Sequence, residues 1–164
     1  MRKAFASFDD VMIERVFQPL TDVLSERIGI SRGGAACFCL DLASVAWIVS
    51  QAPALSSAVQ AWLAGPAMLH VLLLLLGLIV LTSLRTLFRR VGSASANPLR
   101  LAMLPHRAVV LLLLAVRLAG QSGTALGDLA DLAMLACSTA ALYLGACATP
   151  PPLRRRIEAM EPAV

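Results

Sequence analysis

Long apolar stretches, separated by short polar segments, dominate the sequence after residue 32. The clearest is Pro66–Leu84, which contains five consecutive leucines and only one ionisable side chain, His70. Its 19 residues approach the roughly 20 that an α-helix needs to cross the hydrocarbon of a bilayer. Gly33–Ser50 and Leu129–Ala148 have similar lengths and contain one aspartate each. The pattern predicts a transmembrane helix in each of these three segments.

A fourth apolar segment, Leu101–Gly120, is weaker. Its uninterrupted apolar part, Ala108–Val116, follows His106 and Arg107 and is ended by Arg117. Arginine side chains are long enough to reach a membrane interface from these positions. We therefore expect a fourth crossing here, and the alternative is a re-entrant or interfacial helix.

The first 32 residues carry a different pattern, in which apolar side chains recur at the spacing of one helical face. Ser7-Phe8-Asp9-Asp10 has the spacing of a capping box, so we expect an amphipathic helix to begin there. Pro19 should kink or divide this helix, and Gly29 suits its end. At about 100° per residue the apolar and polar faces lie opposite each other. The expected apolar face is Met12, Ile13, Val16, Phe17, Leu20, Val23, Leu24 and Ile28, and the expected polar face is Glu14, Arg15, Gln18, Thr21, Asp22, Ser25 and Glu26.

The apolar face of this helix leaves two interpretations open. Residues 1–32 hold five basic and five acidic residues, and this zero net charge disfavours a helix that binds only anionic lipid. The helix either packs under the chain's own bundle or docks into a groove of a partner subunit. In the second case Phe17, Leu20 and Leu24 form the partner-docking face.

Positive charge is confined to particular connections between the apolar segments. The connections 51–65 and 121–127 carry no charge, whereas the tail 149–164 carries three arginines. Because short basic loops stay in the cytoplasm, both termini are expected to be cytoplasmic. The connection 85–107 has five arginines and no acid, and we call these residues the inner basic loop. They are Arg85, Arg89, Arg90, Arg100 and Arg107.

Together these patterns predict an all-α integral membrane protein. Residues 1–32 would form a cytoplasmic amphipathic helix, 33–148 a bundle of four transmembrane helices, and 149–164 a cytoplasmic basic tail. Composition supports this class, since 59% of residues are hydrophobic and 15% are charged, against about 25% charged in soluble domains. Arginine outnumbers lysine 13 to 1, which suggests a GC-rich bacterial genome and hence the bacterial inner membrane.

Small residues indicate which transmembrane helices touch, because they let backbones approach closely in lipid. Two helices have such residues on one face, and the helix around the leucine run has almost none except Gly77. We interpret the four cysteines in the same structural way, as small buried side chains. The packing ridges are Ala133, Cys137, Ala141 and Gly145 in the last helix, and Ala35, Cys39, Ala43, Ala46 and Ser50 in the first.

Ionisable groups within the membrane are the remaining candidates for function, because charge in hydrocarbon costs free energy. Asp41 is the deepest, and Arg107, His106 and Thr82 are its expected partners. Near the outer end, Arg117 should pair with Asp131 or Asp128. The intramembrane polar candidates are Asp41, His70, Arg117 and Asp131.

No catalytic, cofactor-binding or metal-ligating constellation is found in the sequence. Nucleic acid is not an expected partner, since no aromatic residue lies between Phe88 and Tyr143 to stack bases. The leading hypothesis is a non-catalytic accessory or assembly subunit of a larger inner-membrane complex, with other membrane subunits and lipid as partners. The alternative is a small oligomeric channel or transporter, formed by copies of this chain, for a proton or small ion. It would use Asp41 and the outer polar groups.

Overall fold

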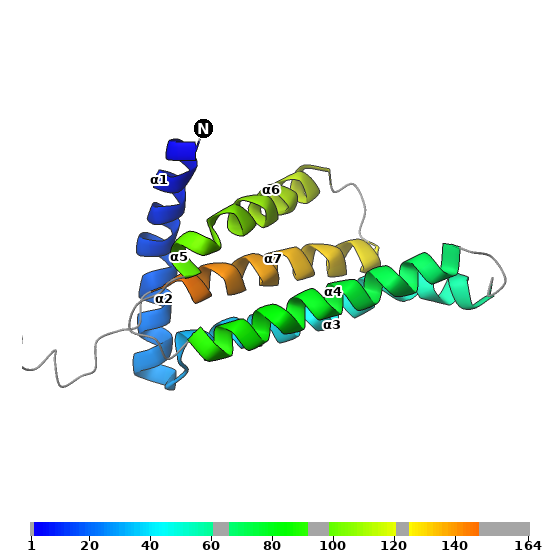
Figure 1. Cartoon of the computed structure of the whole chain (residues 1–164), viewed down its shortest axis with the longest axis horizontal. Helices are drawn as coiled ribbons and strands as arrows, with labels where there is room; N and C mark the ends of the chain where they lie inside the picture. The colour runs from blue at the N-terminus through cyan, green and yellow to red at the C-terminus, as the bar shows by residue number, and fades with distance from the viewer. Residues whose placement is uncertain (1, 61–65, 92–98, 121–124, 148–164) are drawn as a thin grey trace, which may run out of the picture.

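The computed structural model describes residues 2–60, 66–91, 99–120 and 125–147, and these are helical almost throughout (Figure 1). No strand occurs within these ranges, so the prediction of an all-α chain is confirmed. The predicted basic tail, 149–164, lies outside the described residues. The elements in chain order are α1 (Arg2–Met12), the π-helical turn η1 (Ile13–Phe17), α2 (Gln18–Val23), a second π turn η2 (Leu24–Ile28), α3 (Arg32–Gln60), α4 (Pro66–Val91), α5 (Leu99–Ala102), α6 (Leu104–Gly120) and α7 (Leu126–Ala146).

Within these described ranges, three helices are long and apolar enough to cross a membrane, as expected for an integral membrane protein. The candidate crossings are Arg32–Pro53 in α3, Met68–Arg90 in α4 and Leu126–Ala146 in α7. α6 has 17 residues and is not among them. α3 also continues beyond its predicted end at Ser50, since the uncharged, alanine-rich residues that follow sustain a helix through Pro53.

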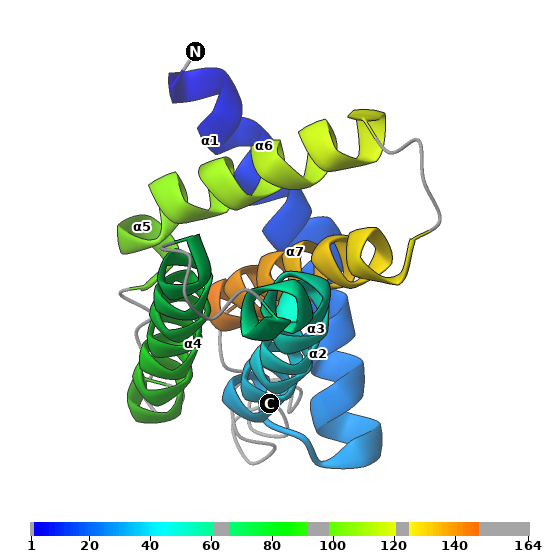
Figure 2. The same ribbon diagram turned by 90° about the vertical axis from the view of Figure 1, so that its right-hand side faces the viewer.

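α3 lies in the middle of the described bundle, with α4 on one side and α7 on the other, and α6 packs against α7 (Figures 1 and 2). The buried face of α3 consists of small and medium side chains. Ala36 and Ala43 have no exposed surface, and Leu40 is 1% exposed. Ala141 of α7 is also fully buried. Small side chains bring the backbones close enough for extensive van der Waals contact, which is what holds helices together in lipid.

The predicted ridge of α7 is buried towards one end and open towards the other. Ala141 and Gly145 are buried and Cys137 is half-buried, whereas Ala133 is exposed. A Cβ atom on Gly145 would lie 2.6 Å from the ring of Phe88 in α4. The final turns of α7 therefore pack closely because this residue is glycine.

α4 exposes most of its apolar surface, as expected for a helix that faces lipid or an apolar partner. Leu72, Leu76 and Ile79 are each more than half exposed. Against α3, Gly77 leaves the space that the indole of Trp47 occupies. The Trp47 indole donates a hydrogen bond of 3.2 Å to the Leu74 carbonyl.

The segments α1, η1, α2 and η2 form one continuous N-terminal helix, which lies across the end of the bundle (Figures 1 and 2). It begins at Arg2, so the predicted start at Ser7 is wrong. Asp9 and Asp10 pair with arginines of the bundle instead of capping a helix.

The interruptions in this helix follow from particular residues. Proline has no N–H, and its ring crowds the carbonyl four residues earlier. The wider π turn η1 lies directly before Pro19 and makes room for the ring, so the helix continues through Pro19. Gly29 ends the helix as predicted, with a φ of 72° that glycine adopts without strain. Ser31 then caps α3 by accepting a 3.1 Å hydrogen bond from the Gly34 amide.

Candidate functional site

The N-terminal helix presents four rows of side chains, each with a spacing of four residues. A row of this spacing would wind around an α-helix, which has 3.6 residues per turn. The π turn η1 holds more residues per turn, so the rows stay aligned along the helix. The contact row is Asp9, Ile13, Phe17 and Thr21, the polar row is Asp10, Glu14, Gln18 and Asp22, the apolar row is Phe8, Met12, Val16 and Leu20, and the outer row is Val11, Arg15, Pro19 and Val23.

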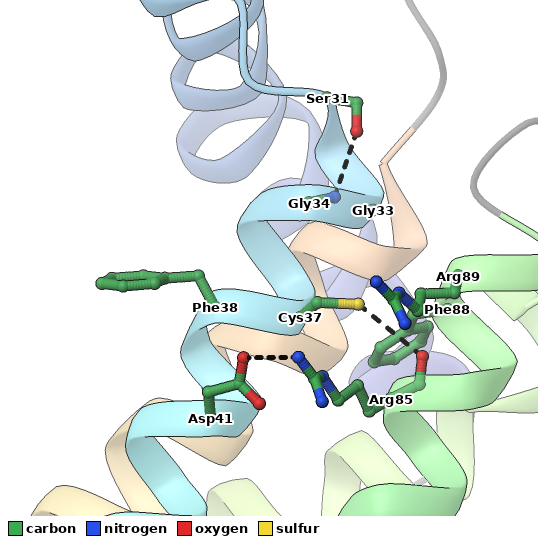
Figure 3. A pocket seen from close by; sticks show the side chains of 9 residues that line it. All are labelled: Ser31, Gly33, Gly34, Cys37, Phe38, Asp41, Arg85, Phe88 and Arg89. Carbon is green, nitrogen blue, oxygen red and sulfur yellow. Dashed lines mark hydrogen bonds and ion pairs between the residues drawn. The ribbon is translucent and has the colours of Figure 1, made fainter.

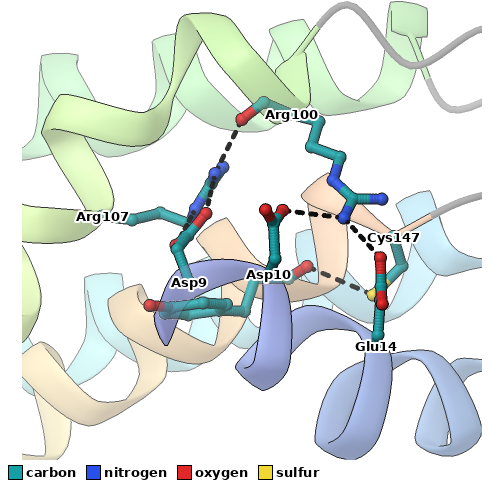
Figure 4. A network of polar contacts seen from close by, with 7 residues as sticks. Asp9, Asp10, Glu14, Arg100, Arg107 and Cys147 are labelled. Carbon is teal, nitrogen blue, oxygen red and sulfur yellow. Dashed lines mark hydrogen bonds and ion pairs between the residues drawn. The ribbon is translucent and has the colours of Figure 1, made fainter. Parts of the chain in front are cut away.

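A buried ion pair joins the contact row to α6. The Arg107 Nε and Nη2 atoms donate hydrogen bonds of 2.9 and 2.6 Å to the two carboxylate oxygens of Asp9 (Figure 4). The Arg107 side chain has no exposed surface, and that of Asp9 is 2% exposed. The Arg107 Nη2 atom also donates a hydrogen bond to the Arg100 carbonyl, 2.6 Å away. This two-point geometry fixes the orientation of the two side chains relative to each other.

Aromatic rings extend the contact to α7. The ring of Phe17 stacks on that of Tyr143, with centroids 4.9 Å apart and an angle of 12° between the planes. The Arg107 guanidinium carbon lies 5.6 Å from the centre of the Tyr143 ring, within cation–π distance. Ile13, 1% exposed, packs beside Tyr143. The ion pair is thus enclosed by apolar surface.

Further along the contact row, the helix meets the end of α7. Thr21 is 1% exposed, and its hydroxyl lies against the Cys147 thiol. The prediction that Thr21 belongs to a polar face opposite the packed one is therefore wrong. Arg32, also buried, donates a hydrogen bond to the Cys147 carbonyl. A cation suits this place, because the last carbonyls of a helix lack helical partners and carry partial negative charge.

The polar row forms a second, more exposed attachment. Arg100 donates hydrogen bonds of 2.8 Å to Asp10 and to Glu14 (Figure 4). Both hydrogen bonds raise the pKa of the Arg100 guanidinium, the bond to Glu14 more than the bond to Asp10. This group therefore stays charged. Gln18 and Asp22 continue the row, joined by a 3.2 Å hydrogen bond.

The expected partner-docking face is divided between two environments. Phe17 and Leu24 are half-buried against the chain's own core. Leu20 is 45% exposed. Packing under the chain's own bundle, one of the two interpretations, thus accounts for Phe17 and Leu24, and a docking role stays a prediction for Leu20.

The inner basic loop is divided as well. Arg100 and Arg107 bind acids of the N-terminal helix, as described above. Arg85 pairs with Asp41, its Nη2 atom 3.0 Å from the carboxylate. Arg89 and Arg90 are exposed near the end of α4. The arginines that the sequence groups together therefore serve different contacts.

The expected partners of Asp41 are wrong. Arg107 is engaged with Asp9, and the Thr82 hydroxyl donates to the Leu78 carbonyl of its own helix. Arg85 reaches Asp41 because α4 lies directly against α3, whereas α6 lies on the far side of α7.

Near the other end of α7, the prediction of a pair between Arg117 and Asp131 is confirmed. Their Nη2 and Oδ2 atoms are 2.6 Å apart. Asp128 is exposed. His70 lies on α4, which packs mainly against α3, so these groups are distributed over both sides of the bundle.

The contacts that join the N-terminal helix to α5, α6 and α7, which we call the junction, were not predicted from the sequence. A pattern that indicates them is nevertheless visible there. Placing residues at 100° intervals assumes an uninterrupted α-helix, and the π turns break that assumption. Acidic or amide side chains recur every fourth residue, which would have indicated a polar stripe facing the arginines of the inner basic loop. These residues are Asp10, Glu14, Gln18, Asp22 and Glu26.

Comparison with known proteins assigns no role to this junction. No protein-family model, curated protein or solved structure matches the chain. Within the described ranges, no three His, Cys, Asp or Glu side chains are arranged to hold a metal ion. What the junction does chemically is hold one helix in a fixed orientation across the end of the helical bundle.

Proposed function

We propose that this chain is a non-catalytic accessory or assembly subunit of a larger bacterial inner-membrane complex, and that its partner docks on the apolar row. The observation that carries the proposal is the fixed N-terminal helix. The Asp9–Arg107 pair holds one row against the bundle, while the neighbouring row stays accessible. In that row Phe8, Val16 and Leu20 are 48%, 49% and 45% exposed.

A helix held in this way suits recognition by another subunit. Its orientation is set before the partner arrives, so binding loses little conformational entropy. Large apolar side chains at regular helical spacing are the anchors that a groove on a partner accepts. The balanced charge of residues 1–32 favours a protein partner over an anionic lipid surface.

In the proposed topology, α6 is a fourth crossing and both termini are cytoplasmic. Its 17 residues span about 25 Å, and local thinning of the bilayer compensates for the difference from about 30 Å. Arg117 at its outer end extends towards the interface. The N-terminal helix then lies flat at the inner surface, where α3 begins and α4 and α7 end.

The alternative, an oligomeric channel or transporter for a proton or small ion, has less support. The Asp41 and Arg85 side chains are 49% and 40% exposed on the flank formed by α3 and α4. Arg117 and Asp131 join α6 to α7 instead. An ion path through these groups would have to form between copies of the chain.

Purification in a mild detergent tests the proposed function. We expect larger, unrelated membrane subunits to co-purify with the chain at a fixed ratio. Leu20→Asp should remove them, because a carboxylate enters the apolar row. Val23→Asp is the matched control, since Val23 is 48% exposed but lies in the outer row. A symmetric homo-oligomer that conducts ions and retains no other subunit would contradict the proposal.

A further inference from the structure

A groove of about 670 Å³ runs between the start of α3 and the end of α4 (Figure 3). Two arginines of α4, Arg85 and Arg89, line one wall. The opposite wall is Ser31 and the beginning of α3, from Gly33 to Asp41. This groove is separate from the junction with the N-terminal helix.

The groove lies at a membrane boundary. The candidate crossing of α3 begins at Arg32, and that of α4 ends at Arg90, so both crossings end beside the groove. Phospholipid headgroups occupy this depth on either face of a bilayer. The placement holds whichever side of the membrane the groove faces.

The lining has the chemistry of an anion site. Arg89 is exposed, and Arg85 is shared with Asp41, whose carboxylate lies deeper in the crossing. Gly33 and Gly34 place no side chain over the first turn of α3, where the helix dipole favours negative charge. The groove therefore offers an anion two guanidinium groups beside the start of a helix, whose Gly34 amide already donates to Ser31.

An apolar side chain on the same flank distinguishes a lipid from a soluble anion. Phe38 is 63% exposed and points away from the bundle beside the groove (Figure 3). At this depth it would contact the acyl chains of a lipid whose headgroup fills the groove. We propose that the groove binds the phosphate of an anionic phospholipid, with Arg89 as its principal cation and Arg85 as the second.

Native mass spectrometry of the purified full-length chain tests this site. Phosphatidylglycerol is titrated against phosphatidylcholine, and retained lipid is counted per chain. We expect selective retention of phosphatidylglycerol. Arg89→Gln should weaken it about tenfold, the loss expected when one charge-assisted hydrogen bond to the phosphate is removed. Arg90→Gln is the control, because it removes the same charge from the adjacent position, which does not line the groove.

A second variant predicts the opposite change. Asp41→Asn removes the carboxylate that competes for Arg85, so retention of phosphatidylglycerol should increase. Circular-dichroism melting confirms that each variant is folded. Equal losses for Arg89→Gln and Arg90→Gln would indicate general charge attraction and overturn the site. Displacement of the lipid by millimolar inorganic phosphate would overturn the assignment to a lipid headgroup.

Discussion

Among the ion pairs of the described residues, burial sets Asp9–Arg107 apart. The pairs of Arg85, Arg100 and Arg117 retain substantial exposure, and exposed pairs contribute about 0–1 kcal/mol each. Removing one partner of a buried pair leaves an uncompensated charge and costs about 3–5 kcal/mol. Among these ion pairs, Asp9–Arg107 is therefore the one whose disruption should loosen the N-terminal helix most.

Neighbouring aspartates allow this difference to be measured. Asp9→Ala should destabilise the docked helix by about 3–5 kcal/mol, because Arg107 stays buried without its acid. Asp10→Ala should cost about 1 kcal/mol or less, since Arg100 is exposed and keeps Glu14. Thermal unfolding and limited proteolysis of residues 1–30 measure both.

Replacing the pair together, Asp9→Leu with Arg107→Met, should recover much of the loss. Equal sensitivity of Asp9→Ala and Asp10→Ala would contradict this account.

Some single contacts were predictable and others were not. The Arg117–Asp131 pair follows from two helices joined by a short connection. The partner of Asp41 could not be predicted in this way, because apolar runs indicate the helices but not their order in space. Arg85 can reach Asp41 only because α4 adjoins α3. The sequence pattern placed Asp9 at a helix start. Its actual partner is an arginine 98 residues away, which local spacing does not reveal.

At the scale of elements, the apolar pattern predicts the helices well and their ends less well. The three longest runs all lie in helices that can cross a membrane. The N-terminal helix begins before its capping motif, because Ser7 is preceded by residues that also favour a helix. Turn type is the feature that the periodicity misses. The π turn before Pro19 shifts the contacting row from the expected apolar face to a row that starts with an acid.

The fourth crossing is the element whose role the apolar pattern leaves open. If α6 crosses the bilayer, a reporter fused at Asn97 should be cytoplasmic and one fused at Ser122 periplasmic. Both positions lie in connections outside the described residues. The physical reason is the inner basic loop, which resists translocation. Reporters on the same side of the membrane would mean that α6 is re-entrant or interfacial, and a periplasmic reporter at Asn97 would reverse the orientation.

At the scale of the whole molecule, the bundle and the N-terminal helix form one unit. α3 packs against both α4 and α7, and the contact row of the N-terminal helix packs against α6 and α7. This arrangement sets apart three surfaces: the apolar flank of α4, the arginine groove and the apolar row. Each proposed interaction uses one surface, and the proposed function requires the N-terminal helix to be docked when the chain is in its membrane.

The native Cys147 allows that docking to be measured directly. Thr21 lies against the Cys147 thiol, so mild oxidation of Thr21→Cys in native membranes should form an intrachain disulfide, detected by peptide mapping. Val23→Cys, in the outer row, should form none, and neither should Thr21→Cys combined with Cys147→Ser. The account predicts cross-linking from position 21 alone. Absence of that cross-link, or equal cross-linking from position 23, would contradict a helix docked through its contact row.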